Sequence, residues 1–554
     1  MFHRIGPLHQ EHIPHNRPTM PYASAYFCDV QTATTLRYEA TKLDSRILRE
    51  INTIIQENSA LAQQYLHAYE KEQEMIRTNH PRPTVHIQLL PGPAGAGIHV
   101  GRTNLPTTRS DIAVLYDEHD GLPRQQHQMI IQNRARPNTE SLQIIKITNP
   151  LLDAMLYPLL DPYSVIGWYP GIRHAIQTGS RNYVSIREHA AYQMAVRDDN
   201  EYLQDTGKLF LQWLVDKALR VQEDKLQWLH DNQNVLRRDT LQNIGDFNTN
   251  ANRNVRPNTD TINPQTSVQI LLPSTFIGSP RHSINTLQDM LALSMQLGAA
   301  TFFVTVTANP AWPEITENLN PGNRRDLRPD IGNRVFHSKQ KRFKDLITKE
   351  NFFGTIRYYG YTVEMQKRQI PHSHWIIAVE PPYNSRDPEY IDTIISAEIP
   401  DPQVDPELYN IICTNYLHLC TEICLPEGSS TCKKKFPKAF QEHTVLQANG
   451  YPLYRRRDNG QYVTKRRGHI DVRLDNRYVV PYNPYLAKMF GCHINVEHLS
   501  GIRGIKYIFN YINKGHDVAH IAQIIRSETG DEIKRYRTVR YMGSSEAHWH
   551  LMTY

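Results

Sequence analysis

The spacing of apolar and polar positions divides the chain into a helical first part and a mixed second part. Apolar residues recur near helical spacing over 43–73, 184–198 and 206–238, so we expect these segments to be helices. Residues 246–267 are dense in Asn and Thr and offer almost nothing to a core, which indicates a linker. The predicted organisation is a loose tail over 1–30, a mainly helical accessory region over 31–245, the polar linker over 246–267 and a folded domain over 268–554.

The second part alternates between helical and strand-like patterns. Thr301–Thr307 is rich in β-branched and aromatic residues, as buried strands are. The expected order around it is a helix over 284–297 capped by Gly298, this strand, a helix over 331–348 and two strands over 354–366 and 372–379. This order predicts an α+β fold, with a central antiparallel sheet and flanking helices.

Composition narrows the function without identifying it. Hydrophobic residues make up 40 % of the 554 positions and charged residues 21 %, so the chain can bury large cores. A net charge of +6 permits a nucleic-acid partner. The sequence has neither a long apolar run nor a secretory signal pattern, and its six cysteines are too few for a disulfide scaffold. We therefore expect an intracellular protein.

Two histidines stand two residues apart on the last predicted strand. Because alternate strand residues share a face, His372 and His374 should point the same way. If the preceding hairpin turns near Gln369, Glu364 lies across from His374 and adds a carboxylate. Such a set suits Mg²⁺ or Mn²⁺ bound to a phosphate. In a chain with 26 histidines, however, a His-x-His pattern also arises by chance.

Two tyrosines near the C-terminus have helical spacing. Tyr507 and Tyr511 are four residues apart, so on a helix they share one face, with Lys506 and Lys514 nearby. A phenolate that attacks a phosphodiester forms a covalent phosphotyrosine and divides strand transfer into two steps. The same spacing also suits two tyrosines that simply pack a helix against a core.

Together these features resemble the Rep nuclease of Helitron rolling-circle transposons, a two-tyrosine HUH endonuclease (His–hydrophobe–His). Phe303–Ile315 looks like the first Rep motif of that family, and Arg328–Phe336 like its Arg-Pro-Asp-Leu block. Further similar blocks are Ser396–Asp401, Phe436–Lys438, Asn476–Leu486 and Cys492–Glu497. The likeness runs from about residue 150 to the end.

The resemblance implies a function and assigns roles. Proteins of this family bind single-stranded DNA, nick it at a transposon end, hold the 5′ end on tyrosine and leave a free 3′-OH. Carried over to this sequence, His372 and His374 are metal ligands, and Tyr507 and Tyr511 are the nucleophiles. The third ligand, Glu364, follows from hairpin geometry and from related Rep enzymes. A nuclear location also follows from this function.

This sequence departs from the family pattern in several places. Ser373 replaces the bulky hydrophobe between the histidines, and Ala308 replaces a Cys. Asn510 and Asn513 stand where Lys and Tyr are common in the family. Full-length relatives continue into a superfamily 1 helicase, whereas no Gly-x-x-x-x-Gly-Lys-Ser/Thr loop occurs here, so no ATP site is expected. We therefore expect a nuclease half, whose helicase is encoded separately or is missing from the gene model.

A short cysteine-rich stretch forms a candidate structural zinc site. One histidine and three cysteines fall within 15 residues: His418, Cys420, Cys424 and Cys432. These residue types are zinc ligands, but the spacing matches no standard finger. Reduced, partly buried thiols explain the stretch equally well.

The segment that follows is strongly basic and carries interleaved tyrosines. Basic groups beside stacking aromatic rings suit a groove for single-stranded DNA, although charged runs are also common on solvated faces. The candidate DNA-binding residues, together with Lys506 and Lys514, are Lys433, Lys434, Lys435, Arg455, Arg456, Arg457, Lys465, Arg466 and Arg467.

Three functions are compatible with these patterns. The first is a metal-dependent single-stranded DNA endonuclease and strand transferase. The second is an inactive or domesticated transposon fragment that still binds DNA. The third, a metal hydrolase of small phosphoesters, leaves Tyr507 and Tyr511 without a role.

Overall fold

The computed structural model describes most of the chain after residue 147 and short pieces before it. The described residues are 3–4, 38, 44–59, 62–63, 77, 129–132, 142–145, 147–176, 182–197, 202–233, 236, 270–322, 324–366, 369–420, 424, 432–447, 452–499, 532–539 and 541–554. The predicted tail, the linker over 246–267 and the tyrosine pair therefore lie almost entirely outside them. The proposed domain boundaries stay a prediction.

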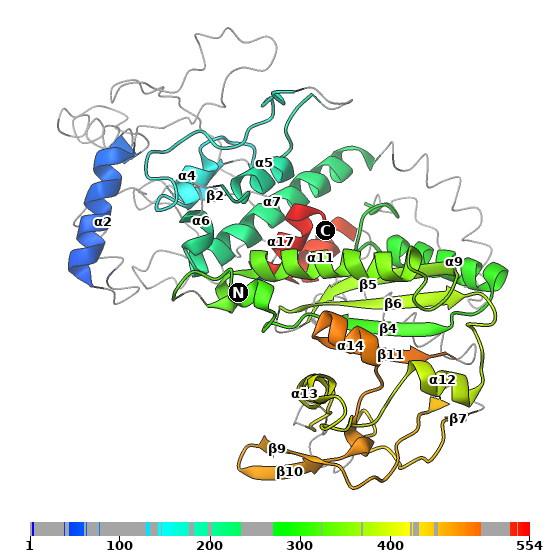
Figure 1. Ribbon diagram of the computed structural model, residues 1–554. Coiled ribbons are helices and arrows are strands. Elements are labelled where there is room, and N and C mark those ends of the chain that lie inside the picture. The colour runs from blue at the N-terminus through cyan, green and yellow to red at the C-terminus, as the bar shows by residue number, and fades with distance from the viewer. Residues whose placement is uncertain are drawn as a thin grey trace, which may run out of the picture.

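The first part of the described chain is mainly helical, as predicted (Figure 1). A short hairpin of β2 (Met129–Gln132) and β3 (Leu142–Ile145) accompanies the helices. The helices are α2 (Ser45–Asn58), α4 (Leu152–Leu156), α5 (Ile186–Gln193), α6 (Tyr202–Asp205) and α7 (Lys208–Asp231).

The second part has the predicted α+β composition. Its strands are β4 (Phe302–Thr307), β5 (Ile356–Met365), β6 (Pro371–Val379), β7 (Val445–Leu446), β8 (Pro452–Leu453), β9 (Val463–Arg467), β10 (Ile470–Leu474), β11 (His493–His498) and β12 (Tyr541–Met542), which pairs with β1 (His3–Arg4). Its helices are α9 (Pro280–Leu297), α10 (Pro313–Thr316), α11 (Pro329–Thr348), α12 (Pro388–Ile394), α13 (Pro406–Asn415), α14 (Pro484–Phe490), α16 (Glu532–Val539) and α17 (Ser544–Met552), with short 3₁₀ turns η3 (Arg325–Leu327) and η4 (Asn476–Tyr478).

The central sheet has four antiparallel strands in the order β11-β4-β6-β5. Its two faces follow from strand alternation. One face carries Trp375, Val304 and Val306, which pack with Phe336 and Phe343 of α11 in the largest core cluster. The other face carries the side chains of the candidate site, so the same strands supply both a core and a polar surface.

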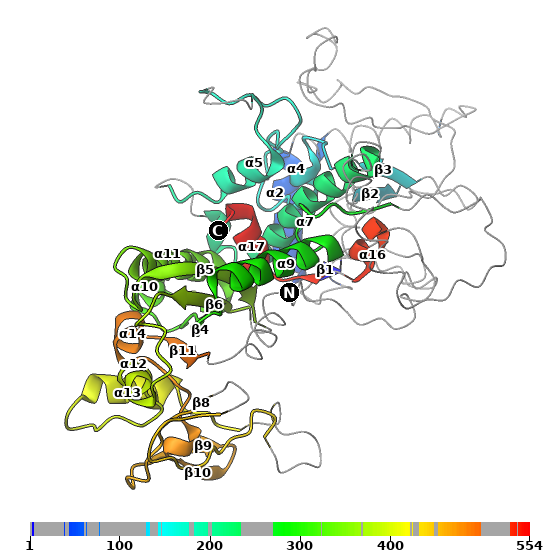
Figure 2. The same ribbon diagram turned by 90° about the vertical axis from the view of Figure 1, so that its right-hand side faces the viewer.

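Helix α9 covers one end of the polar face. Met290 and Leu293 of α9 pack against Phe303, Ile376 and other apolar residues of this face. Ile376 lies two residues after His374 on β6, so the apolar contact begins where the histidine pair ends. Figures 1 and 2 show α13, β9 and β10 on the far side of β11 from α7.

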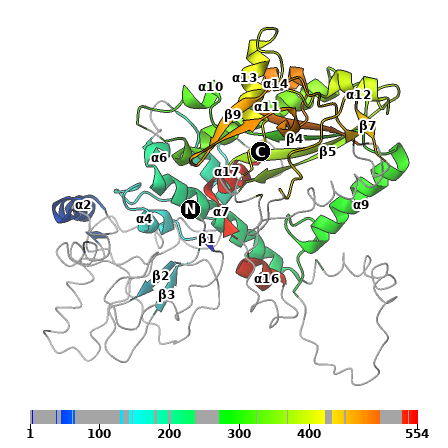
Figure 3. The ribbon, with the colours of Figure 1, turned by 90° about the horizontal axis from the view of Figure 1, so that it is seen from below.

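Helix α17, at the end of the sequence, joins the two parts. Ala547 and Leu551 pack with Phe210 and Leu214 of α7, while Trp549 lies against Phe336 of α11. Helix α16 also contributes to the first part, since Ile533 packs with Leu226 and Leu229 of α7, and Figure 3 shows α7 and α16 together. Hydrophobic cores thus form between segments on either side of 246–267.

None of the helices that the structure describes combines the length and the apolar character that a membrane crossing requires.

Candidate metal centre and nucleic-acid interface

The β5–β6 hairpin brings Glu364 and the histidine pair together. Glu364 lies opposite His372, and Thr362 lies opposite His374. The expectation that Glu364 faces His374 was therefore wrong by two residues. The reason is the turn, in which Gln366 N–H donates to the Ile370 carbonyl, so that the hairpin is centred one residue earlier. A shift of two positions keeps Glu364 on the same face of the sheet, because side-chain direction repeats every second residue.

The potential ligand atoms of these three side chains converge. Each of Glu364, His372 and His374 offers one ligand atom, and these three atoms lie within 4.8 Å of one another. Glu364 Oε2 is 3.6 Å from His372 Nε2. The two imidazole rings stand 4.9 Å apart between centroids and nearly perpendicular, at 86°. Two imidazoles and one carboxylate on one side leave coordination positions open on the other, so the donor set fits a divalent cation that also binds a substrate oxygen.

Strand β4 orients His374 from the side. Thr305 lies beside His374 in the register of the sheet, and its Oγ1 is 2.9 Å from His374 Nδ1. A hydrogen bond at Nδ1 sets the tautomer of the ring and leaves metal binding to Nε2. The Phe303 ring stacks on the same imidazole at 5.5 Å with an interplanar angle of 8°. Sequence reasoning missed Thr305, although its place in the alternation of β4 marks it as a residue of the polar face.

The residue between the histidines faces the core. The Ser373 hydroxyl, which is fully buried, donates to Gln340 Oε1 of α11 at 2.8 Å. The Trp375 indole N–H also donates to Gln340 Oε1, at 3.1 Å. These bonds and the apolar packing of Trp375 fix β6 on α11, which holds both imidazoles toward the opposite face. The departure from a bulky residue at 373 is thus accommodated by a buried polar contact.

The polar face continues across β4 to the edge strand β11. Asn495 pairs with Thr305 in the register, and Glu497 pairs with Phe303. Asn495 Nδ2 donates to Glu497 Oε1 at 3.0 Å. Burial raises the pKa of the Glu497 carboxyl above its ordinary value, against the opposing effects of the Asn495 bond and the charge of Lys438. The sequence comparison included Asn495 and Glu497 in a similar block but assigned them no role.

The structure does not test the roles of the tyrosines. Tyr507 and Tyr511, with Lys506 and Lys514, lie outside the described residues. Their roles as nucleophiles and phosphate contacts stay predictions.

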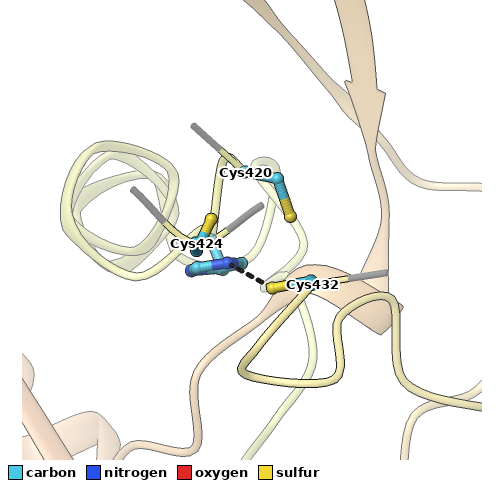
Figure 4. Close-up of side chains that lie close together, drawn as sticks. Cys420, Cys424 and Cys432 are labelled. Atoms are coloured by element: carbon cyan, nitrogen blue, oxygen red, sulfur yellow. Dashed lines mark hydrogen bonds between the residues drawn. The ribbon is translucent and has the colours of Figure 1, made fainter. Parts of the chain in front are cut away.

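The histidine and the three cysteines of the candidate zinc site do come together. The four potential ligand atoms of His418, Cys420, Cys424 and Cys432 lie within 4.8 Å of one another (Figure 4). The cluster is compatible with a soft metal such as zinc.

The basic residues divide into exposed and structural ones. The side chains of Lys433, Lys434, Lys435, Arg466 and Arg467 are exposed, and Lys465 is half-buried. They remain candidates for binding DNA.

Arg456, by contrast, is not available to a phosphate. It is only 4 % exposed, and its guanidinium donates to the carbonyls of Ala397, Asn476 and Val479. Its expected role in binding DNA was therefore wrong. Charge alone does not distinguish an arginine that caps backbone carbonyls from one that contacts DNA, and here burial decides.

The two neighbours of Arg456 already have acidic partners. Arg457 makes a bidentate pair with Glu398, with Nη2 2.6 Å from Oε2. Arg455 lies 3.5 Å from Asp392 and 3.8 Å from Glu398. Both are partly exposed, so DNA contacts by them stay a prediction, but their positive charges are largely compensated.

The comparison with known proteins agrees with the sequence resemblance. Residues 188–377 match the family model described as the Helitron helicase-like domain at the N-terminus. This span contains Glu364, His372 and His374, and it ends before the His–Cys cluster and the tyrosine pair. No curated protein matches the chain. Residues 188–377 thus form a Helitron helicase-like domain, and this match supports a Helitron Rep/helicase-like protein.

Proposed function

We propose that this chain is a metal-dependent endonuclease and strand transferase for single-stranded DNA, acting in Helitron transposition. The convergence of Glu364, His372 and His374 on the polar face of the sheet, within the matched family domain, carries the proposal. Such a site suits the chemistry of a phosphodiester, because its open positions face away from the protein ligands. The exposed basic residues of the neighbouring segment support a nucleic-acid partner.

The reaction would proceed in two balanced steps. In the first, the phenolate of Tyr507 or Tyr511 attacks phosphorus, the bond from phosphorus to the 3′ oxygen breaks, and that oxygen leaves as a 3′-hydroxyl after taking a proton. The 5′ end stays on the protein as a phosphotyrosine. In the second step, the 3′-hydroxyl of another strand attacks this phosphotyrosine and releases the phenol, which restores a phosphodiester.

The described residues have separate parts in this reaction. When bound, Mg²⁺ or Mn²⁺ would neutralise charge on the scissile phosphate. Glu364, His372 and His374 would hold that ion, and Thr305 would keep the His374 ring in its binding orientation. The sheet core behind β6 keeps the three ligands in place before DNA arrives, so little reorganisation is needed.

The test uses 5′-labelled and 3′-labelled single-stranded oligonucleotides with Mn²⁺. We expect a protein–DNA adduct that survives denaturation, disappears in the Tyr507→Phe/Tyr511→Phe double variant and persists in one of the single variants. His372→Ala/His374→Ala should also lose it. Tyr485→Phe is the matched control, since this tyrosine is 54 % exposed on α14 and belongs to neither site. DNA binding without any adduct, across varied sequences, would identify a non-catalytic transposon fragment instead.

A further inference from the structure

The segment between β6 and β11 holds four metal-binding side chains that the proposed reaction does not use. We call His418, Cys420, Cys424 and Cys432 the His–Cys cluster. Its ligand atoms lie within 4.8 Å of one another, and His418 Nε2 is 3.3 Å from Cys432 Sγ. In a tetrahedral site with Zn–S bonds of about 2.3 Å, two sulfurs are about 3.8 Å apart. The cluster is therefore within about 1 Å of the size that zinc requires.

The backbone around the cluster already orients the ligands. Lys433 N–H donates to the Cys424 carbonyl at 2.8 Å, so the backbone at Cys424 is joined directly to the residue that follows Cys432. His418 N–H donates to the Tyr478 carbonyl at 2.9 Å. The His418 ring also stacks on Phe436 at 4.4 Å, which restricts its rotation. Figure 4 shows Cys420, Cys424 and Cys432 grouped together, and a dashed line marks the contact at the Cys432 sulfur.

The backbone at Cys432 is also held by a local hydrogen bond. Lys435 N–H donates to the Cys432 carbonyl at 2.8 Å, which fixes the turn at this ligand. Outside the cluster, the Arg467 guanidinium donates to the Cys420 carbonyl at 3.3 Å, which ties β9 to the same loop.

Neither a disulfide nor the burial of reduced thiols accounts for the whole cluster. No disulfide joins Cys420, Cys424 and Cys432, and a disulfide between any two would leave the third cysteine and the histidine unexplained. Simple burial of thiols does not require an imidazole nitrogen among the sulfurs. Four soft protein ligands fill a tetrahedral site, and closed sites of this kind are structural rather than catalytic.

We propose that the His–Cys cluster binds one structural zinc ion, which fastens the loop that begins at Lys433 to the end of α13. His418 and Cys420 follow α13, whereas the three exposed lysines Lys433–Lys435 follow directly after Cys432. A closed site at that point sets the position of the lysines relative to the sheet. This inference does not depend on the proposed nuclease activity, because an inactive DNA-binding protein would need the same loop.

Metal analysis of the full chain, purified without chelators, tests the site. We expect about one zinc ion per chain by elemental mass spectrometry, and its loss in Cys424→Ala/Cys432→Ala. Cys413→Ala is the matched control, because Cys413 is a half-buried free thiol on α13 outside the cluster. His372→Ala/His374→Ala should retain the zinc. Substoichiometric zinc in the wild type, or zinc that follows the His372 and His374 pair, would overturn the proposal.

A second measurement on the wild-type protein covers the case in which the cysteine variants fail to fold. A mercurial thiol reagent should release about one zinc ion per chain, detected with a colorimetric chelator. Protein produced with Co²⁺ should show the intense ligand-field bands of a tetrahedral site and thiolate-to-cobalt charge transfer. Cobalt spectra of octahedral, sulfur-free type would contradict a His–Cys site.

Discussion

The central sheet and the segment that connects β6 to β11 (residues 380–492) use polar side chains in opposite ways. On the sheet, alternate residues of β5 and β6 point three ligand atoms at one another, as a metal centre requires. In the connecting segment, the buried polar side chains bind other groups of the protein itself. Arg456 caps three backbone carbonyls, and Glu398 holds Arg457.

This difference shows that residue type alone is a poor guide to function here. Histidines on a regular strand have directions that the backbone sets, so their shared face follows from their spacing. Arginines in irregular segments have no such rule, and long side chains reach either solvent or the nearest unsatisfied carbonyl. The comparison predicts that changes on the sheet alter chemistry, whereas changes at buried polar side chains of the connecting segment alter stability.

The largest expected effect is on the sheet. His374→Ala should reduce adduct formation by at least about 10²- to 10³-fold, because it removes part of the charge stabilisation at the phosphate. Its melting temperature should change by only a few degrees. Adduct yield and thermal unfolding, measured in parallel, test both statements. His469→Ala, at an exposed histidine between β9 and β10, is the control and should change neither. An active His374→Ala protein would remove the basis for the comparison.

The second prediction concerns Arg456. Arg456→Met should lower the free energy of unfolding by about 3 kcal/mol, because it leaves buried carbonyls without their charged donor. DNA affinity of the folded protein should stay the same. Arg466→Met, at an exposed arginine on β9, should leave the free energy of unfolding unchanged. If Arg466 contacts a phosphate, this variant should make the slope of log affinity against log salt concentration shallower by about one. Denaturant unfolding and DNA titrations at several salt concentrations separate the two. Weaker DNA binding by Arg456→Met under folding conditions would contradict the structural role.

The smallest predicted effect concerns the hydrogen bond between Thr305 and His374 at the metal centre. Thr305→Val keeps the shape of the side chain but removes the hydroxyl that contacts His374 Nδ1. We expect metal affinity to fall by about 10- to 100-fold, as for other outer-shell partners. The measurement is the Mn²⁺ concentration needed for half-maximal adduct formation. Thr348→Val is the control, at a half-buried threonine of α11 whose hydroxyl donates only to the Lys344 carbonyl of the same helix. Adduct formation at saturating Mn²⁺ should recover in Thr305→Val, and failure to recover would indicate a role other than metal binding.

Much of the fold was predictable because it follows local patterns. The strand over 301–307 appears as β4 within one residue of its predicted ends. The helices over 184–198 and 206–238 appear as α5 and α7, which begin within two residues of the prediction but end at Gln193 and Asp231, five and seven residues early. Gly298 ends α9 with a φ of +89°, as the expected cap. The pairing of Glu364 was less predictable, because register depends on the turn, where one residue of difference moves a partner by two positions.

The sequence by itself determined which residues share a face: spacing on a strand placed His372, His374 and Glu364 on one side of the sheet, and alternation placed Ser373 and Trp375 on the other. Only the tertiary structure decided which separate segments meet. It brought Thr305 of β4 to His374, gathered the His–Cys cluster from three pieces of loop, buried Arg456 against three carbonyls and inserted α17 between α7 and α11. The physical reason is that side-chain direction within a strand is set by local backbone geometry, whereas contacts between distant segments depend on how the whole chain packs its apolar surface and satisfies its buried polar groups.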